Sequence, residues 1–360
     1  MSELTLRQLL EDMVQRKASD LHITAGVSPE LRIDGSITPT EYEVLTPERC
    51  AQIAYSVLSD DQRKRFETTK ELDFSFGVKG LSRFRANVFL QRGVVSMAIR
   101  QIPYEILAMD KLGLPSVARE FTNRQKGLVL VTGPTGSGKS TTLAAMLDQI
   151  NGTRQSHIMT IEDPIEYIHH HKKCIVNQRE VGADTASFPT ALKYVLRQDP
   201  DIILIGEMRD LETIEAALTI AETGHLVFAT LHTNSTYEAV NRIVDVFPAD
   251  QQKQILTQLA FTLEGVVTQQ LIPRSRGTGR VMCAEVLVCT AAIKAVIREG
   301  KIHQIYSLMQ AGQKFGMQTM NQALLQTVLD KHVTAEDALE RSTDRAELEG
   351  MLQKVLRAAA

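Results

Sequence analysis

Hydrophobic positions are spaced differently in the two parts of this chain. In about the first hundred residues they recur at helical spacing, as in LRQLLEDMV, or alternate with polar residues, as in the run Ser82–Phe89. ELRIDGSI adds a hairpin signal at Asp34–Gly35, and two extended runs are joined near Arg92–Gly93. Residues 47–70 favour helix. These alternating helix and hairpin segments predict a small α+β domain over residues 1–104.

A connector that contains two prolines and a glycine, IPYEILAMDKLGLPSV, follows this part, and residues 105–118 are predicted to be an interdomain linker. Beyond it, the short apolar runs GLVLVTG, HIMTIED, DIILIGE and HLVFATLH alternate with helical stretches. Such continuous runs are typical of strands buried on both faces of a parallel sheet, and RVMCAEVLV adds one further strand. Residues 119–360 are therefore predicted to form an α/β domain that becomes mostly helical from about residue 290.

Composition narrows the classes of function. The 360 residues are 43% hydrophobic and 23% charged with a net charge of −3, so no basic excess points to nucleic acid. Acids among the first apolar positions argue against a signal peptide, and no run of about 18 apolar residues predicts a membrane span. The four cysteines form no C-x-x-C pair, which suggests a reducing cytosol.

A phosphate-binding loop is predicted at GPTGSGKST, which follows the strand GLVLV and precedes the helical run TTLAAMLDQI. Its glycines let backbone N–H groups point towards phosphates at the start of a helix, and a chance glycine-rich turn is the alternative. Lys139 is expected to reach the β and γ phosphates of ATP, and Ser140 to ligate Mg²⁺. The predicted ATP-binding residues are Gly133, Pro134, Thr135, Gly136, Ser137, Gly138, Lys139, Ser140 and Thr141.

Acidic residues at strand ends are the candidates for activating water. Asp201 and Glu207 bracket the run DIILIG and lie roughly 20 Å apart at about 3.3 Å per residue. Because ligands bind beyond the carboxyl ends of parallel strands, Glu207 shares the edge that carries Gly133, whereas Asp201 lies at the opposite edge. We expect Glu207 to orient or activate the attacking water, and a structural salt bridge with Arg209 is the alternative.

The same edge is predicted to hold Glu162 and Asp163, which end the run HIMTIED. Carboxylates there can hold Mg²⁺ through water or position the nucleophile, and a cap on the next segment is the alternative reading.

Two histidines bracket the run LVFATL. They are seven positions apart, roughly 23 Å along a strand, so they cannot share a nucleotide or a metal ion. His232 lies at the ligand edge and is expected to donate a hydrogen bond to the γ-phosphate. His225 lies at the far edge, where a contact with another element or subunit and a purely structural role remain open. A separate run, residues 169–171, is all histidine but completes no metal site and is expected to be a solvated loop.

Four motifs together resemble the secretion ATPase superfamily, and within it the type IV pilus retraction ATPases: GPTGSGKST, IEDPIE, RQDPDIILIGEMRD and ETGHLVFATLHTN. The resemblance covers almost the whole chain. It implies a PAS-like N-terminal domain, a RecA-like P-loop ATPase domain with C-terminal helices, and ATP bound between the two. It also implies a cytoplasmic homohexamer at the inner-membrane base of the pilus machine. There the ring would contact a platform protein and use ATP hydrolysis for pilin removal, pilus retraction and twitching motility.

The resemblance also directs attention to Arg83 and Arg85, which share one face of the predicted strand SRFRANVF. In the family this strand supplies arginines to nucleotide bound in the ring, where a guanidinium would stabilise transition-state charge. A solvated strand face is the alternative, and Arg100 is a weaker third candidate.

Cysteine spacing separates this sequence from some related branches. The chain lacks the C-x-x-C pairs of the four-cysteine zinc site in pilus-extension and type II secretion relatives. The alternative that this chain is an accessory, paralogous retraction ATPase stays open, and such a paralogue is also a candidate partner. AIKAV, residues 292–296, departs from an AIRAR-like segment of the family, because Lys294 keeps one charge and Val296 loses the other.

Other classes of function are disfavoured. The chain has no tryptophan and no basic stripe, which argues against a nucleic-acid translocase built on a RecA-like core. A complete phosphate-binding loop together with Glu207 argues against a scaffold that does not hydrolyse ATP.

Overall fold

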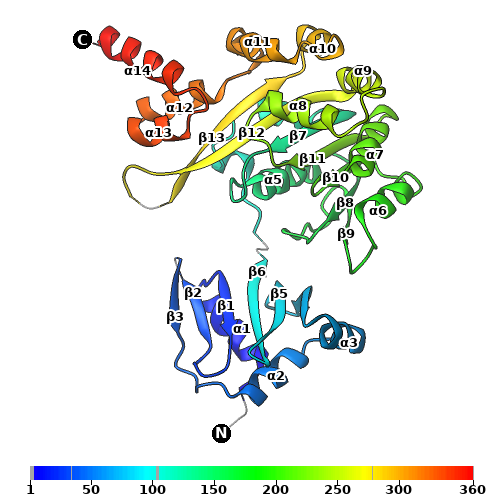
Figure 1. Ribbon diagram of the computed structural model, residues 1–360, viewed down its shortest axis with the longest axis vertical. Helices are drawn as coiled ribbons and strands as arrows, with labels where there is room; N and C mark the ends of the chain where they lie inside the picture. Colours follow the sequence, from blue (N-terminus) through cyan, green and yellow to red (C-terminus); the bar gives the residue numbers. More distant parts are fainter. Residues whose placement is uncertain (1–3, 34, 103–104, 278, 360) are drawn as a thin grey trace. The chain divides into compact units, whose positions relative to one another are not determined.

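The computed structural model describes residues 4–33, 35–102, 105–277 and 279–359. The chain divides into two compact units, Met1–Glu105 with Glu166–Ile168, and Ile106–Ile165 with His169–Ala360 (Figure 1). Asp34 of the predicted hairpin turn and the predicted domain boundary at residue 104 lie outside the described residues.

The first unit is a six-stranded sheet of order β3-β2-β1-β6-β5-β4, in which every neighbouring pair is antiparallel. Its elements are α1 (Leu6–Gln15), β1 (Asp20–Ile23), β2 (Glu30–Ile33), β3 (Ser36–Pro39), α2 (Pro47–Tyr55), α3 (Asp60–Thr69), β4 (Glu71–Val78), β5 (Ser82–Gln91) and β6 (Val94–Ile102). The opening helix and both predicted hairpins are present.

Two details of this unit differ from the sequence prediction. The helical segment predicted over residues 47–70 is two helices, because Ser59 forms a capping box with Gln62 and starts a second helix. Strand β4 was missed, and it pairs with β5 along its whole length.

The second unit is built on a seven-stranded sheet of order β13-β12-β7-β11-β10-β8-β9, parallel except for the pair β12–β13. Its strands are β7 (Gly127–Thr132), β8 (His157–Glu162), β9 (Ile175–Glu180), β10 (Ile202–Ile205), β11 (Leu226–Leu231), β12 (Leu263–Pro273) and β13 (Arg280–Val288). The four predicted apolar runs are β7, β8, β10 and β11, which confirms the parallel sheet. Strands β9 and β12 were missed.

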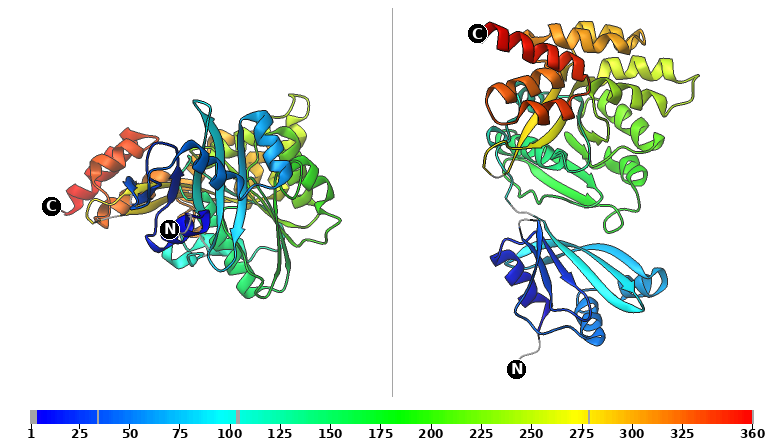
Figure 2. Two further views of the ribbon diagram at one scale, coloured as in Figure 1. Left: turned by 90° about the horizontal axis from the view of Figure 1, so that it is seen from below. Right: turned by 60° about the vertical axis from the view of Figure 1, so that its left-hand side comes forward.

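Helices cover this sheet and extend it at the C-terminal end. They are α4 (Val117–Thr122), α5 (Lys139–Thr153), α6 (Phe188–Val195), α7 (Leu211–Glu222), α8 (Thr236–Asp245), α9 (Gln252–Thr262), α10 (Ala291–Arg298), α11 (Ile305–Ala311), α12 (Met320–Leu329), α13 (Ala335–Arg341) and α14 (Arg345–Ala359). Short 3-10 turns lie at Met109–Lys111, Ile302–Gln304 and Gln313–Phe315. The last helices share a small apolar core with β12 and β13, and α12 lies against β13 (Figure 2).

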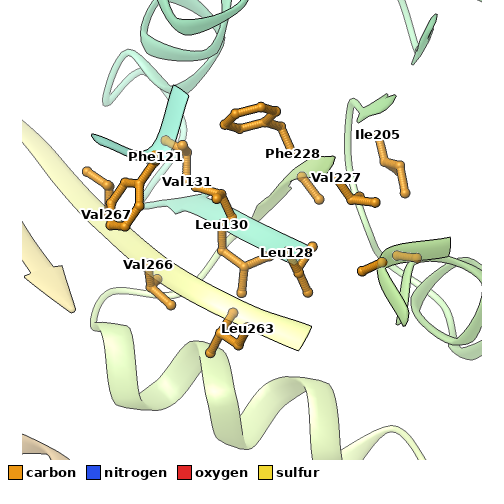
Figure 3. Close-up of a cluster of buried hydrophobic side chains, with 14 of the residues drawn as sticks. Phe121, Leu128, Leu130, Val131, Ile205, Val227, Phe228, Leu263, Val266 and Val267 are labelled. Carbon is orange, nitrogen blue, oxygen red and sulfur yellow. The ribbon is translucent and has the colours of Figure 1, made fainter. Parts of the chain in front are cut away.

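The core of the second unit lies where β12, β7 and β11 run side by side (Figure 3). Every residue of β7 and β11 is buried, which is why these strands are continuously apolar in sequence. The Phe121 ring packs so close to Gly265 that a Cβ at that glycine would lie 2.2 Å from the ring. The expected linker, residues 105–118, contributes Met109 and Val117 to this same core.

All four cysteines are buried free thiols: Cys50, Cys174, Cys283 and Cys289. Burial raises the pKa of each thiol. Among the described residues, no helix combines the length and apolar composition needed to cross a membrane.

Candidate nucleotide site

The phosphate-binding loop lies between β7 and α5, as its sequence context predicted. Gly133, Gly136 and Gly138 have φ angles of 136°, 79° and 89°, a region that side chains with a Cβ rarely adopt. The first residue of α5 is Lys139, whose Nζ donates to the carbonyl oxygens of Gly133 (2.9 Å) and Pro134 (3.1 Å). The loop therefore curls around the lysine ammonium, in front of the helix N-terminus that favours anions.

Charge around Lys139 is set by two opposing effects. Partial burial lowers the pKa of its ammonium, and the negative charge of Glu207 acts to raise that pKa. The lysine and the carboxylate thus belong to one electrostatic neighbourhood, although they lie far apart in the sequence.

Glu207 follows β10, and its carboxylate contacts Arg209 and His232. Its Oε2 lies 2.6 Å from Arg209 Nη2, and its Oε1 lies 3.2 Å from His232 Nε2. The Glu207 side chain is 21% exposed and the His232 side chain 42% exposed, so both reach solvent. Glu207 therefore forms the salt bridge with Arg209 that was the alternative to a catalytic role. It also contacts His232, the predicted catalytic histidine.

The net effect of this environment is to lower the pKa of Glu207. Burial acts in the opposite direction, but the hydrogen bond from Arg209 and the charges of His232 and Arg209 outweigh it. A carboxylate with a lowered pKa is charged near neutral pH and accepts hydrogen bonds well, yet it is a weak proton acceptor. Such a group is suited to orienting water more than to removing its proton.

Glu162 and Asp163 lie at the same edge, at the end of β8. Glu162 is 8% exposed, and its Oε1 accepts hydrogen bonds from Thr160 Oγ1 (2.6 Å) and Gln178 Nε2 (3.2 Å). Asp163 is exposed. Glu207 raises the pKa of Arg209, and the negative charge of Asp163 raises it further. The register of the parallel strands, with Ile205 opposite Ile161, aligns the ends of β8 and β10.

Asp201 and His225 lie at the other edge of the sheet, where each has hydrogen-bond partners within the second unit. Asp201 Oδ2 accepts a hydrogen bond of 2.8 Å from the His157 backbone N–H, which ties the starts of β10 and β8 together. His225 Nδ1 lies 3.1 Å from both the Ile220 carbonyl oxygen and Thr223 Oγ1, at the end of α7. Asp201 and His225 therefore lie at the opposite ends of their strands from Glu207 and His232, as predicted.

The run of three histidines lies in a loop, and His170 and His171 are exposed, as the sequence suggested. His169 differs, because it is 8% exposed and burial lowers its pKa to about 4. Within the described ranges, no group of three or more metal-binding side chains comes together here or elsewhere.

Arg83 and Arg85 lie on β5 in the first unit and do share one face. Burial alternates along the strand, with Phe84 and Ala86 in the core and the two arginines half-buried on the other side. Arg83 Nη2 donates to Ser75 Oγ at 2.6 Å, and Arg85 Nη2 lies 3.9 Å from an Asp73 carboxylate oxygen.

A hollow of about 340 Å³ opens on this face of the first unit, and Arg85 and Arg100 are among its lining residues. Arg100 forms an ion pair of 2.8 Å with Asp20, so the hollow carries charges of both signs. Its two arginines place cationic groups where a bound anion could reach them.

The AIKAV segment, residues 292–296, lies within α10. Lys294 Nζ lies 3.0 Å from Glu264 Oε1, and Arg124 Nε lies 3.4 Å from the other oxygen of the same carboxylate. Val296 packs against the core of the second unit. The lysine that replaces an arginine in this segment is thus part of a charge network inside the unit.

Strand β12, which lies behind the loop, was not predicted from the sequence. Thr268 and Thr132 share a buried hydroxyl hydrogen bond of 2.6 Å, and Gln269 Nε2 donates to the Ser137 carbonyl oxygen at 2.7 Å. A Cβ at Gly133 would lie 2.3 Å from the Gln269 carbonyl oxygen, so a glycine is required there. The clue in the sequence was a run of β-branched and polar residues, GVVTQQLI, without charges.

Comparisons with known proteins agree with this geometry. A family model described as "Type II/IV secretion system protein" matches residues 2–340. The "Type IV pilus retractation ATPase PilT" of Pseudomonas aeruginosa is 48% identical over 339 residues, which cover 94% of this chain and 98% of that protein. The "Type IV pilus ATPase PilU" of the same organism is 42% identical over 350 residues, which cover 97% of this chain and 92% of that protein.

Solved structures show the same fold over nearly the whole chain. The crystal structure of "the Pilus Retraction Motor PilT and Bound ADP" superposes with a TM-score of 0.92 at 52% identity, covering 96% of this chain and 99% of that chain. The Legionella pneumophila ATPase DotB gives a TM-score of 0.82 at 25% identity, covering 94% and 96%. Both the resemblance inferred from four motifs and the predicted fold class are confirmed. From its loop, its sheet and these relatives together, the chain belongs to the family of type II/IV secretion system ATPases.

Proposed function

We propose that this protein is the hexameric motor whose ATP hydrolysis retracts type IV pili and so powers twitching motility. The observation that carries the proposal is the 48% identity to a pilus retraction ATPase over 98% of that relative's length. The accessory retraction ATPase is the second candidate, supported by 42% identity over 97% of this chain.

In this proposal the loop binds the phosphates of ATP. Backbone N–H groups of the loop, other than at Pro134, which has none, and at Ser137, which donates to the Pro134 carbonyl oxygen, face the phosphates together with the N-terminus of α5. Lys139 leaves its loop carbonyls to bind the β and γ phosphates. The donors present fit Mg²⁺, because an exposed hydroxyl at Ser140 and carboxylates at the same sheet edge are the oxygen ligands that it prefers. Bound there, Mg²⁺ would neutralise charge on the phosphate oxygens.

Glu207 and His232 divide the remaining chemistry. The lowered pKa of Glu207 keeps it charged, so it accepts a hydrogen bond from the attacking water and fixes its direction. His232 exchanges its contact with Glu207 for a hydrogen bond to the γ-phosphate. Glu162 and Asp163, at the next strand end, would help to hold Mg²⁺ or position the nucleophile.

The ring would complete this site. Arg83 and Arg85 lie in the first unit on a partly exposed strand face, and the 3.9 Å separation between Arg85 and Asp73 leaves the guanidinium able to bind an anion. In a homohexamer these arginines would neutralise transition-state charge on the nucleotide. The ring would act in the cytoplasm against a platform protein at the inner membrane, beside a paralogous retraction ATPase and without nucleic acid.

The test in cells uses Glu207→Gln, with exposed Glu215→Gln on α7 as the matched control. Each version is expressed in cells that lack both retraction ATPases, and the retraction of labelled pili is recorded. We expect retraction with the control and none with Glu207→Gln. If the wild-type protein restores no retraction unless a second retraction ATPase is present, it is the accessory protein.

The test of ring completion compares Arg83→Ala and Arg85→Ala with the exposed surface change Lys79→Ala. ATPase rate per subunit is measured against protein concentration, beside the oligomer mass. Both arginine variants should form rings and bind ATP yet turn over at least about tenfold more slowly, because an arginine of this kind can contribute 10³–10⁵ in rate. A rate in verified monomers that neither arginine change affects would contradict the idea.

A further inference from the structure

Gln269 is a buried polar side chain beside the phosphate-binding loop. It lies on β12 and is fully buried, with its Nε2 donating to the Ser137 carbonyl oxygen. Its amide oxygen has no hydrogen-bond partner in the part of the chain that the structure describes. A half-satisfied buried amide is unfavourable for stability, so its presence here calls for a role beyond packing.

Gln269 contacts the phosphate-binding loop through both its side chain and its backbone. The Gln269 carbonyl oxygen lies where a Cβ at Gly133 would come within 2.3 Å of it, and Gln269 Nε2 would lie 3.2 Å from a Cβ at Gly138. Gln269 therefore touches the loop at its start and at its end, from the side of the sheet.

The hydrogen bond to Ser137 fixes the orientation of one peptide group. The peptide between Ser137 and Gly138 is trans, because among the described residues only the Asp163–Pro164 bond is cis. In a planar trans peptide the C=O and the N–H point in opposite directions. When Gln269 holds the Ser137 carbonyl towards β12, the Gly138 N–H must point away from β12.

We propose that Gln269 is a positioning residue that aims the Gly138 N–H at the phosphates of the bound nucleotide. Gly138 has a φ of 89° and lies directly before α5, so its peptide is free to rotate unless something restrains it. Gln269 supplies that restraint without touching the nucleotide. The inference rests on the proposed binding of ATP at this loop and adds a residue to it.

The experiment compares Gln269→Met with two controls. Methionine keeps the length of the side chain and cannot donate to Ser137. Gln270→Met changes the same residue type at the next position, where Nε2 reaches the Arg341 carbonyl oxygen at 3.4 Å. Thr268→Val removes the buried hydroxyl bond to Thr132 and serves as a control for lost stability. For each variant we measure Tm, Kd for ADP, and KM and kcat for ATP.

We expect Gln269→Met to raise Kd for ADP and KM for ATP about tenfold, the size of effect typical of one lost hydrogen bond to a charged group. Gln270→Met should change neither constant, and Thr268→Val should lower Tm with Kd unchanged. Equal Kd values for Gln269→Met and wild type, or an equal rise in Kd with Thr268→Val, would overturn the proposal. Wild-type protein that binds no ADP would instead contradict nucleotide binding at the loop.

If Gln269→Met does not fold, Gln269→Leu takes its place. Leucine is apolar and cannot donate a hydrogen bond to the Ser137 carbonyl oxygen. The same rise in Kd for ADP is expected, and a wild-type Kd in folded Gln269→Leu would overturn the proposal as well.

Discussion

His169 should make the stability of this protein depend on pH in the range where an ordinary histidine becomes charged. The imidazole is buried, and this burial lowers its pKa from 6.5 to about 4 in the folded chain. In the unfolded chain the pKa returns to about 6.5. Between these two values the unfolded state binds more protons, so the free energy of unfolding falls as the pH falls.

The size of the effect follows from the displacement of the pKa. One pKa unit corresponds to about 1.4 kcal/mol, so the full penalty below pH 4 is about 3 kcal/mol. At pH 5.5, one unit below the unfolded pKa, the penalty is about 1 kcal/mol, and at pH 7.5 it is negligible.

The assay is urea unfolding at pH 7.5 and pH 5.5 for wild type, His169→Leu and His170→Leu. His170 is the adjacent residue, and it is exposed, so its replacement controls for loss of a histidine from the same loop. Acidification should destabilise wild type and His170→Leu by about 1 kcal/mol more than His169→Leu. If all three proteins lose the same stability, or if the His169 ring protons titrate near pH 6.5 in NMR spectra, the reasoning is refuted.

Three predictions concern the nucleotide site. Lys139→Ala should bind ATP weakly and lose at least about 10²-fold in kcat, because charge stabilisation carries most of this chemistry; phosphate release near the wild-type rate would contradict the loop assignment. Glu207→Gln should bind ATP and hydrolyse it about 10²–10³-fold more slowly. Asp201→Asn should hydrolyse ATP normally and lose about 1 kcal/mol of stability. Slow hydrolysis by Asp201→Asn and normal hydrolysis by Glu207→Gln would show that the nucleotide does not bind at the Glu207 edge of the sheet. His232→Ala should lower kcat at saturating ATP about tenfold, while His225→Ala should lower Tm with kcat per assembled subunit unchanged; equal kcat losses would refute the distinction.

The candidate site was predictable from the sequence because parallel strands share one direction. Once continuous apolar runs identify β7, β10 and β11, the residues at their carboxyl ends must meet at one edge. The observed register, with Leu231 opposite Thr132, places His232 level with the first loop glycine. Neither step needs knowledge of side-chain contacts.

The parts that escaped prediction depend on contacts between distant segments. Strand β12 contains Thr268 and Gln269, whose burial makes sense only when β7 and the loop lie against them. Strand β9 is at the edge of the sheet, and its exposed residues break the apolar run expected of a buried strand. Three consecutive histidines give no signal of which one is buried, because burial of His169 is set by packing around its loop.

The buried thiols make this protein unusually convenient for fluorescence work. A thiolate is the form that reacts with maleimide dyes, and burial both blocks access to the native cysteines and keeps them protonated. New cysteines at Val44 in the first unit and Tyr194 in the second, whose side chains are 62% and 46% exposed, would therefore label without removal of native residues. Energy transfer between dyes at these two sites can follow the separation of the units in the unmodified background while ATP turns over.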